Sequence, residues 1–254
     1  EELRRRTDEA IALGIFGVPS FVVDGAHLYW GQDRMRFVEG VRSPPPSPAP
    51  VSPAPGRAPG KIDFYWDFSS PFAYLASTQV EAVARRAGAE VEWRPILLGG
   101  LFRSLGGPDV PLATFPEAKQ RHLLLDLKRW AAFWGVPFTF PSRFPTNSLR
   151  ALRVYLALPP DRRPSYREAV FRACWAEDRD ITDDSVLAAC VGDATAARDA
   201  FVRANADDVK AELRASTEGA AARGVFGVPT FLVGDALYWG QDRLDLVEDA
   251  AARR

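Results

Sequence analysis

A serine and a proline stand where the first regular pattern of the sequence changes. Apolar and polar residues alternate through Ile62, Phe64, Trp66 and Phe68, and Ser69-Ser70-Pro71 follows. The alternation predicts a strand, and a serine before a proline is typical of a helix start. We expect a helix from there to about Gly88, with Ser70 at the junction.

A hydroxyl at this junction could do chemistry. It can donate a hydrogen bond to an external thiolate, and the N-H groups of a helix start favour an anion. A dithiol oxidoreductase would need cysteines where Ser70 and Ala73 stand, so thiol-disulfide exchange by the protein itself is excluded. The alternative is that Ser70 only caps the helix, which spacing alone favours.

Two later motifs could hold the rest of a thiol ligand. If the Val228-Pro229 peptide is cis, the Val228 backbone can pair with an extended, peptide-like ligand, whereas an ordinary strand-entry proline would have no such role. The backbone of Gly240-Gln241-Asp242-Arg243 could bind a carboxylate and Asp242 an ammonium group, or Asp242 could simply cap a helix. Together these groups suit the zwitterionic γ-glutamyl end of glutathione.

The surrounding elements predict an α/β fold. Residues 90–96 alternate as a second strand, about 101–205 are mostly helical with proline breaks, and a helix, two strands and a closing helix follow. This order indicates a thioredoxin-like sheet that carries an inserted α-helical domain.

The last of these elements occurs twice. Residues 2–34 match 212–243 after one length change at a turn, and Pro, Ala and Ser dominate 43–60. We therefore expect a partial repeat of the C-terminal helix-hairpin-helix unit over 1–42, a linker over 43–60 and the complete domain over 61–254. The repeat has too few apolar residues to bury its own face, so it is either disordered or competes with 212–254 for one place in the core.

Composition excludes some partners and sites. The net charge is −1, and no apolar run approaches the roughly 20 residues of a membrane helix, so neither nucleic acid nor a membrane is expected. Cys174 and Cys190 are expected to be reduced core thiols in a cytoplasmic chain, with a structural disulfide between them as the alternative. His27 and His122 are too few and too far apart for a zinc site, so no metal is expected.

Several motifs together resemble one family, the 2-hydroxychromene-2-carboxylate isomerases, which have a DsbA-like thioredoxin fold and are related to kappa-class glutathione transferases. The resemblance covers 61–254. The motifs are Asp63-Phe64-Tyr65, Phe68-Ser69-Ser70-Pro71, Leu125-Asp126-Leu127-Lys128-Arg129-Trp130-Ala131, Phe144-Pro145-Thr146-Asn147-Ser148-Leu149-Arg150-Ala151, Asp180-Ile181-Thr182-Asp183, Phe226-Gly227-Val228-Pro229 and Trp239-Gly240-Gln241-Asp242-Arg243.

The resemblance implies roles for individual residues. Ser70 would be the catalytic serine that holds the glutathione sulfur. The Val228 backbone, before a cis Pro229, would bind the cysteinyl part, and Gln241 and Asp242 the γ-glutamyl part.

Two further positions carry weaker expectations. Lys119 would also help to bind glutathione, or else be a solvated helix charge, and Asn147 would lie near the substrate or else cap a helix. The chain departs from the family at Gly107, where members commonly have an asparagine, which puts the affinity for glutathione in doubt.

The function implied is glutathione-dependent cis-trans isomerisation of an aromatic α,β-unsaturated keto acid. The type reaction converts 2-hydroxychromene-2-carboxylate to trans-o-hydroxybenzylidenepyruvate in aromatic compound catabolism. The expected partner is a small aromatic substrate, and the resemblance also allows a homodimer. A kappa-type glutathione transferase or peroxidase, or a non-catalytic thioredoxin-like peptide-binding module, is the alternative.

Overall fold

The computed structural model describes residues 1–44, 59–108 and 110–253, which form two compact units. Unit 1 consists of 1–47 and 110–136, and unit 2 of 48–109 and 137–254. Most of the predicted linker, 45–58, lies outside the described residues. The sequence placed 110–136 in the helical insertion of the complete domain, whereas in the structure they cluster with the N-terminal repeat.

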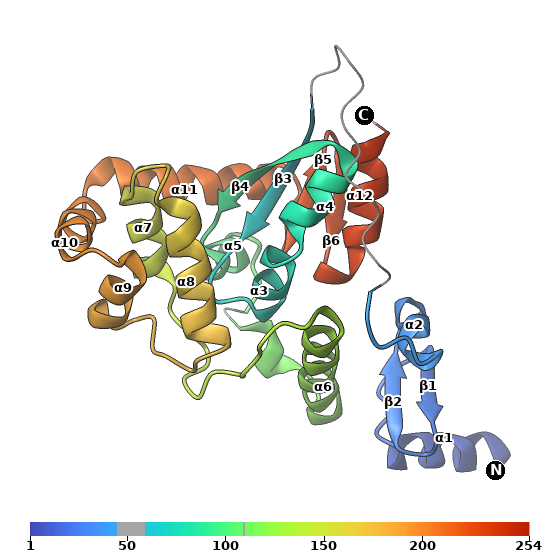
Figure 1. Ribbon diagram of the computed structural model, residues 1–254. Coiled ribbons are helices and arrows are strands. Elements are labelled where there is room, and N and C mark those ends of the chain that lie inside the picture. The colour runs from blue at the N-terminus through green and yellow to red at the C-terminus, as the bar shows by residue number, and fades with distance from the viewer. Residues whose placement is uncertain (45–58, 109, 254) are drawn as a thin grey trace. The chain divides into compact units, whose positions relative to one another are not determined.

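Unit 2 is built on a four-stranded sheet of order β4-β3-β5-β6 (Figure 1). The strands are β3 (Gly60–Trp66), β4 (Ala89–Pro95), β5 (Thr230–Val233) and β6 (Ala236–Trp239). Strand β3 pairs parallel with β4 and antiparallel with β5, and β5 pairs antiparallel with β6. This is the thioredoxin-like arrangement that the sequence predicted.

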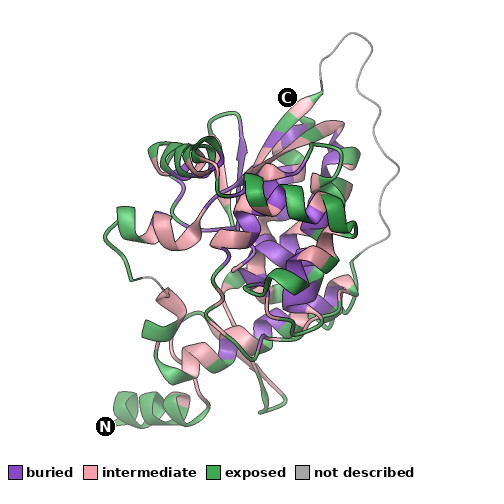
Figure 2. Ribbon diagram, turned by 90° about the vertical axis from the view of Figure 1, so that its left-hand side faces the viewer, coloured by how far each residue is buried: buried purple, intermediate pink, exposed green. Residues whose placement is uncertain are grey.

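Buried aromatic rings fill the space around this sheet. Phe64 of β3 is fully buried and stacks on Phe231 of β5, with ring centroids 4.9 Å apart. Trp66, also fully buried, meets Tyr155 and Phe171 of the helical region at 5.0 and 5.5 Å. The alternation of the first strand thus places its large apolar side chains in the core, where the purple ribbons of Figure 2 gather.

The helix expected from Pro71 to Gly88 is two helices, α3 (Pro71–Ser77) and α4 (Val80–Ala87). The hydroxyls of Ser77 and Thr78 donate to the carbonyls of Tyr74 and Leu75, each at 2.7 Å. Side chains that bond nearby carbonyls compete with the helical ladder, which explains the break. Helix α3 is therefore only seven residues long.

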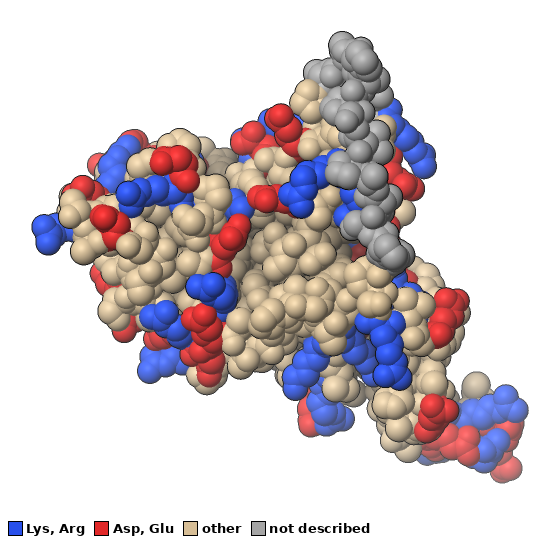
Figure 3. Space-filling view, in the orientation of Figure 1, with Lys and Arg blue, Asp and Glu red and all other residues tan. Residues whose placement is uncertain are grey.

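Most of the remaining helices of unit 2 lie in or at the start of the expected helical region of about 101–205, namely α5 (Leu98–Ser104), α7 (Leu149–Ala157), α8 (Arg163–Trp175), α9 (Asp184–Val191) and α10 (Ala194–Arg203). Helix α11 (Asp207–Ala222) is the helix expected after that region. Helix α11 contacts α5, α7 and β4, and α12 (Leu244–Ala252) packs on α4 and the sheet. On the face in Figure 3, acidic and basic side chains are interspersed, in keeping with the small net charge.

Unit 1 contains the N-terminal repeat and one long helix. The repeat consists of α1 (Glu2–Ala12), β1 (Ser20–Val23), β2 (His27–Trp30), η1 (Gln32–Arg34) and α2 (Met35–Val38). Residues 110–136 supply η2 (Pro111–Thr114) and α6 (Glu117–Trp134).

The repeat does not take the place of its C-terminal counterpart in the core. Its hairpin β1-β2 forms a separate two-stranded sheet, while β5-β6 pairs with β3. Helix α1 buries no residue, whereas its counterpart α11 buries Val209, Leu213 and Ala220. In this structure the edge of β3 is therefore occupied by β5 and not by β1, so the two copies do not share one place in the sheet.

Candidate functional site

Ser70 lies at the junction between β3 and α3, as the sequence predicted. Its Oγ accepts a hydrogen bond from the Ala73 backbone at 3.1 Å and donates one to the Val228 carbonyl at 3.2 Å. Ser70 thus caps α3 and also contacts the loop before β5. Because α3 is short, its dipole contributes little. The Ser70 hydroxyl is therefore the main group at this position that could stabilise an anion.

A buried carboxylate lies beneath this junction. Asp67 is fully buried and accepts from the backbone of Ser69 at 2.9 Å and of Leu98 at 2.7 Å. Burial raises the pKa of Asp67 above the ordinary value. Hydrogen bonds from the Ser148 hydroxyl, from those two backbone groups and from the Ser69 side chain act in the opposite direction but are outweighed. Asp67 therefore ties the start of α3 to the start of α5 and to the residue before α7.

The loop before β5 approaches Ser70 from the other side. The Val228-Pro229 peptide is cis, and Thr230 Oγ1 donates to the Gly227 carbonyl at 2.7 Å. The Gly240 N-H donates to the Pro229 carbonyl at 3.0 Å, which joins this loop to the turn after β6. A Cβ at Gly227 would lie 2.9 Å from Trp239 Nε1, so a larger residue there would require the Trp239 side chain to shift.

These contacts bring five of the seven expected site residues into one neighbourhood. Ser70 contacts Val228, Pro229 is bonded to Gly240, and Gln241 and Asp242 follow in η3 (Gln241–Arg243), which lies beside α3. Gln241 is buried. The arrangement offers a hydroxyl, backbone polar groups and a carboxylate along one edge of unit 2.

Two expected residues have other surroundings. Lys119 belongs to unit 1, where its ammonium group lies 3.9 Å from the centroid of Phe115 and 5.3 Å from that of Trp30. Asn147 lies in unit 2, and its Oδ1 accepts from the Leu149 N-H at 3.0 Å at the start of α7. Asn147 is exposed and directly precedes Ser148.

Sequence reasoning missed two residues that build the junction. Ser148 donates to Asp67, and Trp175 Nε1 donates to the Phe68 carbonyl at 2.7 Å. No periodicity could have found them, because both come from the helical region more than 70 residues after Ser70.

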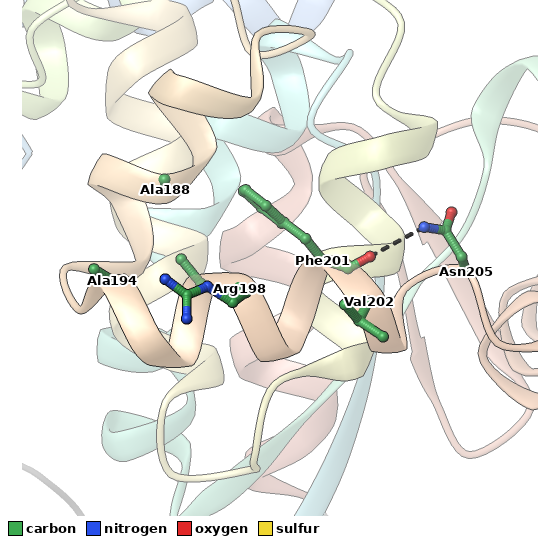
Figure 4. Close-up of a pocket in the computed structure, with 7 residues that line it drawn as sticks. Ala188, Ala194, Arg198, Phe201, Val202 and Asn205 are labelled. Carbon is green, nitrogen blue, oxygen red and sulfur yellow. Dashed lines mark hydrogen bonds between the residues drawn. The ribbon is translucent and has the colours of Figure 1, made fainter.

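A surface hollow elsewhere in unit 2 contains none of the expected site residues. It measures about 400 Å³ and lies between α9 and α10 (Figure 4). It is lined by Ala188, Ala194, Ala197, Arg198, Phe201, Val202 and Asn205. With Arg198 as the sole ionisable group in its lining, it offers no arrangement for thiol chemistry.

The comparisons with known proteins identify the family. The model of the DSBA-like thioredoxin domain matches residues 1–41 and 61–252. A 2-hydroxychromene-2-carboxylate isomerase of Sphingobium xenophagum is 37% identical over 192 residues, which is 74% of this chain and 95% of that protein. The chain belongs to this isomerase family.

A solved structure and a more distant relative agree with this assignment. The structure of a 2-hydroxychromene-2-carboxylate isomerase superposes with a TM-score of 0.64 at 29% identity and covers 76% of this chain and 95% of its own. Glutathione S-transferase kappa 1 of Rattus norvegicus is 26% identical over 208 residues, 76% of this chain and 91% of that protein. Within the described part of the chain, no helix is long and apolar enough to cross a membrane.

Proposed function

We propose that this chain is a glutathione-dependent isomerase that acts on an aromatic α,β-unsaturated keto acid. The substrate would be 2-hydroxychromene-2-carboxylate, as the names of the relatives suggest, and the product trans-o-hydroxybenzylidenepyruvate, as in the type reaction of the family. The observation that carries the proposal is the contact between Ser70 Oγ and the Val228 carbonyl. It places a turnable hydroxyl against the backbone that would hold a peptide-like thiol.

The groups on this edge fit glutathione. A thiol tripeptide needs a donor for its sulfur, a backbone partner for its cysteinyl part, and polar groups for its charged γ-glutamyl end. Ser70, Val228 and the Gln241-Asp242 pair would supply these in turn. Gly107 can contribute only backbone, so it adds no side-chain contact.

The Ser70 hydroxyl would serve by rotation. Its proton now points to the Val228 carbonyl, and a hydroxyl turns about its bond at little cost. Turning toward a thiolate would stabilise the anion and leave the Val228 carbonyl ready to accept an N-H group from the ligand. One group would thus couple the binding of sulfur to the binding of the ligand backbone.

Bound glutathione would supply a thiol that adds reversibly to the conjugated carbon, so that the former double bond can rotate before elimination. The protein's part is orientation and stabilisation of the anion. Asp67, buried and held by backbone N-H groups, would fix the turn that presents Ser70.

The decisive experiment follows substrate absorbance with and without glutathione. For Ser70→Ala, we expect kcat/KM to fall roughly a hundredfold, the usual effect of removing one donor to a reacting anion. Ser70→Thr keeps the hydroxyl and should recover part of the rate. Ser77→Ala, in the same helix, should leave the rate unchanged. Isomerisation that is independent of glutathione would refute the proposal.

A kappa-type transferase is the second candidate, because the rat kappa relative matches nearly its whole length. The same assay separates the two, since an isomerase leaves total glutathione constant while a transferase consumes it. Accumulation of a conjugate would decide for the transferase.

A further inference from the structure

Within unit 1, the N-terminal repeat is bound to the C-terminal half of α6 by polar and aromatic contacts. The guanidinium group of Arg34 binds the carboxylate of Asp126 through two hydrogen bonds of 2.9 Å. The ring of Phe37 lies edge-on to Trp130 at 5.0 Å and to Phe133 at 5.5 Å. An ion pair and an aromatic cluster thus hold the repeat at this end of the helix.

In the N-terminal half of α6, a histidine makes the contact. His122 is only 3% exposed, and its ring centroid lies 5.3 Å from that of Phe16 and 6.5 Å from that of Trp30. Phe16 and Trp30 belong to the repeat and lie 5.2 Å from each other. The three rings, here called the His122 cluster, therefore keep the imidazole away from water as long as the repeat lies on α6.

The buried imidazole favours its neutral form. Among the described residues, His122 Nδ1 is buried and has no hydrogen-bond partner. A protonated imidazole carries an N-H on both ring nitrogens, so protonation would leave a buried N-H at Nδ1 without an acceptor. Burial accordingly lowers the pKa of His122 below its ordinary value of 6.5.

The charges that act on His122 do not reverse this preference. The carboxylate of Asp126, one turn further along α6, favours the charged imidazole, but its two oxygens already accept from Arg34. Arg34 of the repeat and Arg129 of α6 both oppose protonation. The ion pair that holds the repeat at one end of α6 thus does not neutralise a charge at the other.

Two further charges border the His122 cluster. Asp33 of the repeat forms an ion pair with the neighbouring Arg34 at 3.1 Å. Lys119, one turn before His122 on α6, places its ammonium group 5.3 Å from the ring centroid of Trp30. A second cation beside the same ring makes a charged imidazole less favourable.

We propose that His122 is a pH-sensitive latch, with the repeat bound to α6 while the imidazole is neutral and released when it is protonated. The bound state has the lower pKa, so release takes up a proton. The contribution of His122 to the contact is therefore fully present above the ordinary pKa of 6.5 and is lost as pH falls below it.

Hydrogen exchange of the full chain at pH 7.5 and pH 5.5 tests the latch, with rates corrected for the intrinsic effect of pH. Amides of 14–38 and 117–134 should lose protection at pH 5.5 by up to roughly tenfold. This is the largest change that one proton gives one pH unit below an ordinary pKa of 6.5. Protection that is equal at the two pH values would overturn the proposal.

The two histidines of the chain supply a matched pair of variants. His122→Phe keeps an aromatic ring that cannot titrate, so 14–38 should stay equally protected at both pH values. His27 is exposed at the start of β2, and His27→Gln should keep the pH response of the wild type. A response that persists in His122→Phe or disappears in His27→Gln would assign the effect to another group.

Titration of the imidazole protons by NMR tests the latch without replacing His122. In the wild type, the pKa of His122 should lie below that of the exposed His27, and an equal or higher value would overturn the proposal. Coupling between binding and protonation is reciprocal, so releasing the repeat by Phe37→Ala should raise the pKa of His122 toward that of His27. If Phe37→Ala exposes 14–38 to exchange and leaves the titration of His122 unchanged, the two events are not coupled and the latch is refuted.

Discussion

Most of the hydrogen bonds of the polar side chains around Ser70 go to backbone groups, and Asp67 also accepts from the Ser148 hydroxyl. Ser70 bonds Ala73 and Val228, and Asp67 bonds Ser69 and Leu98. Such bonds set loop shape, since each fixes a backbone group from a different segment. A residue change here therefore acts on geometry as well as on chemistry.

Asp67 should make stability depend on pH. Burial raises its pKa in the folded chain above the ordinary 3.8, so the folded state binds the proton more tightly than the unfolded one. Its contribution to stability is thus fully present below pH 3.8 and declines as pH rises through the raised pKa. Urea unfolding across this range should show the decline in the wild type.

Asp67→Asn supplies the comparison, because an amide does not titrate. The difference in unfolding free energy between wild type and variant should fall with rising pH over the same window. A difference that stays constant with pH would show that Asp67 has the same pKa in the folded and the unfolded state.

Cys174 should be an inert thiol. It is 1% exposed, and burial raises its pKa to about 12, against a hydrogen bond from Thr146. Because the thiolate is the reactive form, alkylation at pH 8 should be far slower at Cys174 than at a free cysteine. Peptide mass spectrometry after iodoacetamide treatment measures this, with the half-buried Cys190 as the internal reference. Rapid native-state labelling of Cys174 would contradict the packing.

At the scale of elements, the loop before β5 has a counterpart with the same hydrogen bond, the loop before β1 in the repeat. Thr230 Oγ1 donates to the Gly227 carbonyl at 2.7 Å, and Ser20 Oγ donates to the Gly17 carbonyl at the same distance. The C-terminal loop contacts Ser70 through the Val228 carbonyl. The repeat therefore provides a matched control for changes within this loop.

Thr230→Val should loosen the C-terminal loop. It leaves the Gly227 carbonyl without its buried donor, which costs about 1–3 kcal/mol of unfolding free energy, and glutathione binding should weaken because Val228 lies in the same loop. Calorimetric titration with glutathione measures the effect. Ser20→Ala removes the equivalent bond in the repeat and should leave glutathione binding as in the wild type. Equal losses of glutathione affinity in both variants would show that the loop before β5 is not part of the glutathione site.

At the scale of the whole molecule, the two copies differ in what they pack on. Phe231 is fully buried against Phe64 in the four-stranded sheet, whereas its counterpart Phe21 lies in an isolated hairpin and is only half-buried. The same residue type should therefore contribute very differently to stability.

Phe231→Ala should cost about 3–5 kcal/mol, the usual effect of removing a buried phenyl ring. Phe21→Ala should cost less than half as much, since part of that ring already meets water. Urea unfolding of the two variants compares them directly. A similar loss in both would mean that the hairpin of the repeat is packed as tightly as the sheet.

The sequence by itself determined the parts of this protein that depend on neighbouring residues. Alternation placed β3 and β4, the serine-proline pair placed the start of α3, and matching letters revealed the repeat. These signals are local, so they survive without knowledge of the fold. The break between α3 and α4 escaped them, because it depends on the bonds from the Ser77 and Thr78 hydroxyls to the Tyr74 and Leu75 carbonyls, which the order of residues does not show.

Only the tertiary structure decided which surfaces meet. Residues 14–34 and 224–243 carry nearly the same motif, so no pattern within either copy could say which one pairs with β3 and which one holds α6. That choice depends on contacts far apart in sequence, such as Arg34 with Asp126 and Phe64 with Phe231. The same holds for Asp67, whose partners Leu98 and Ser148 are brought to it by folding alone.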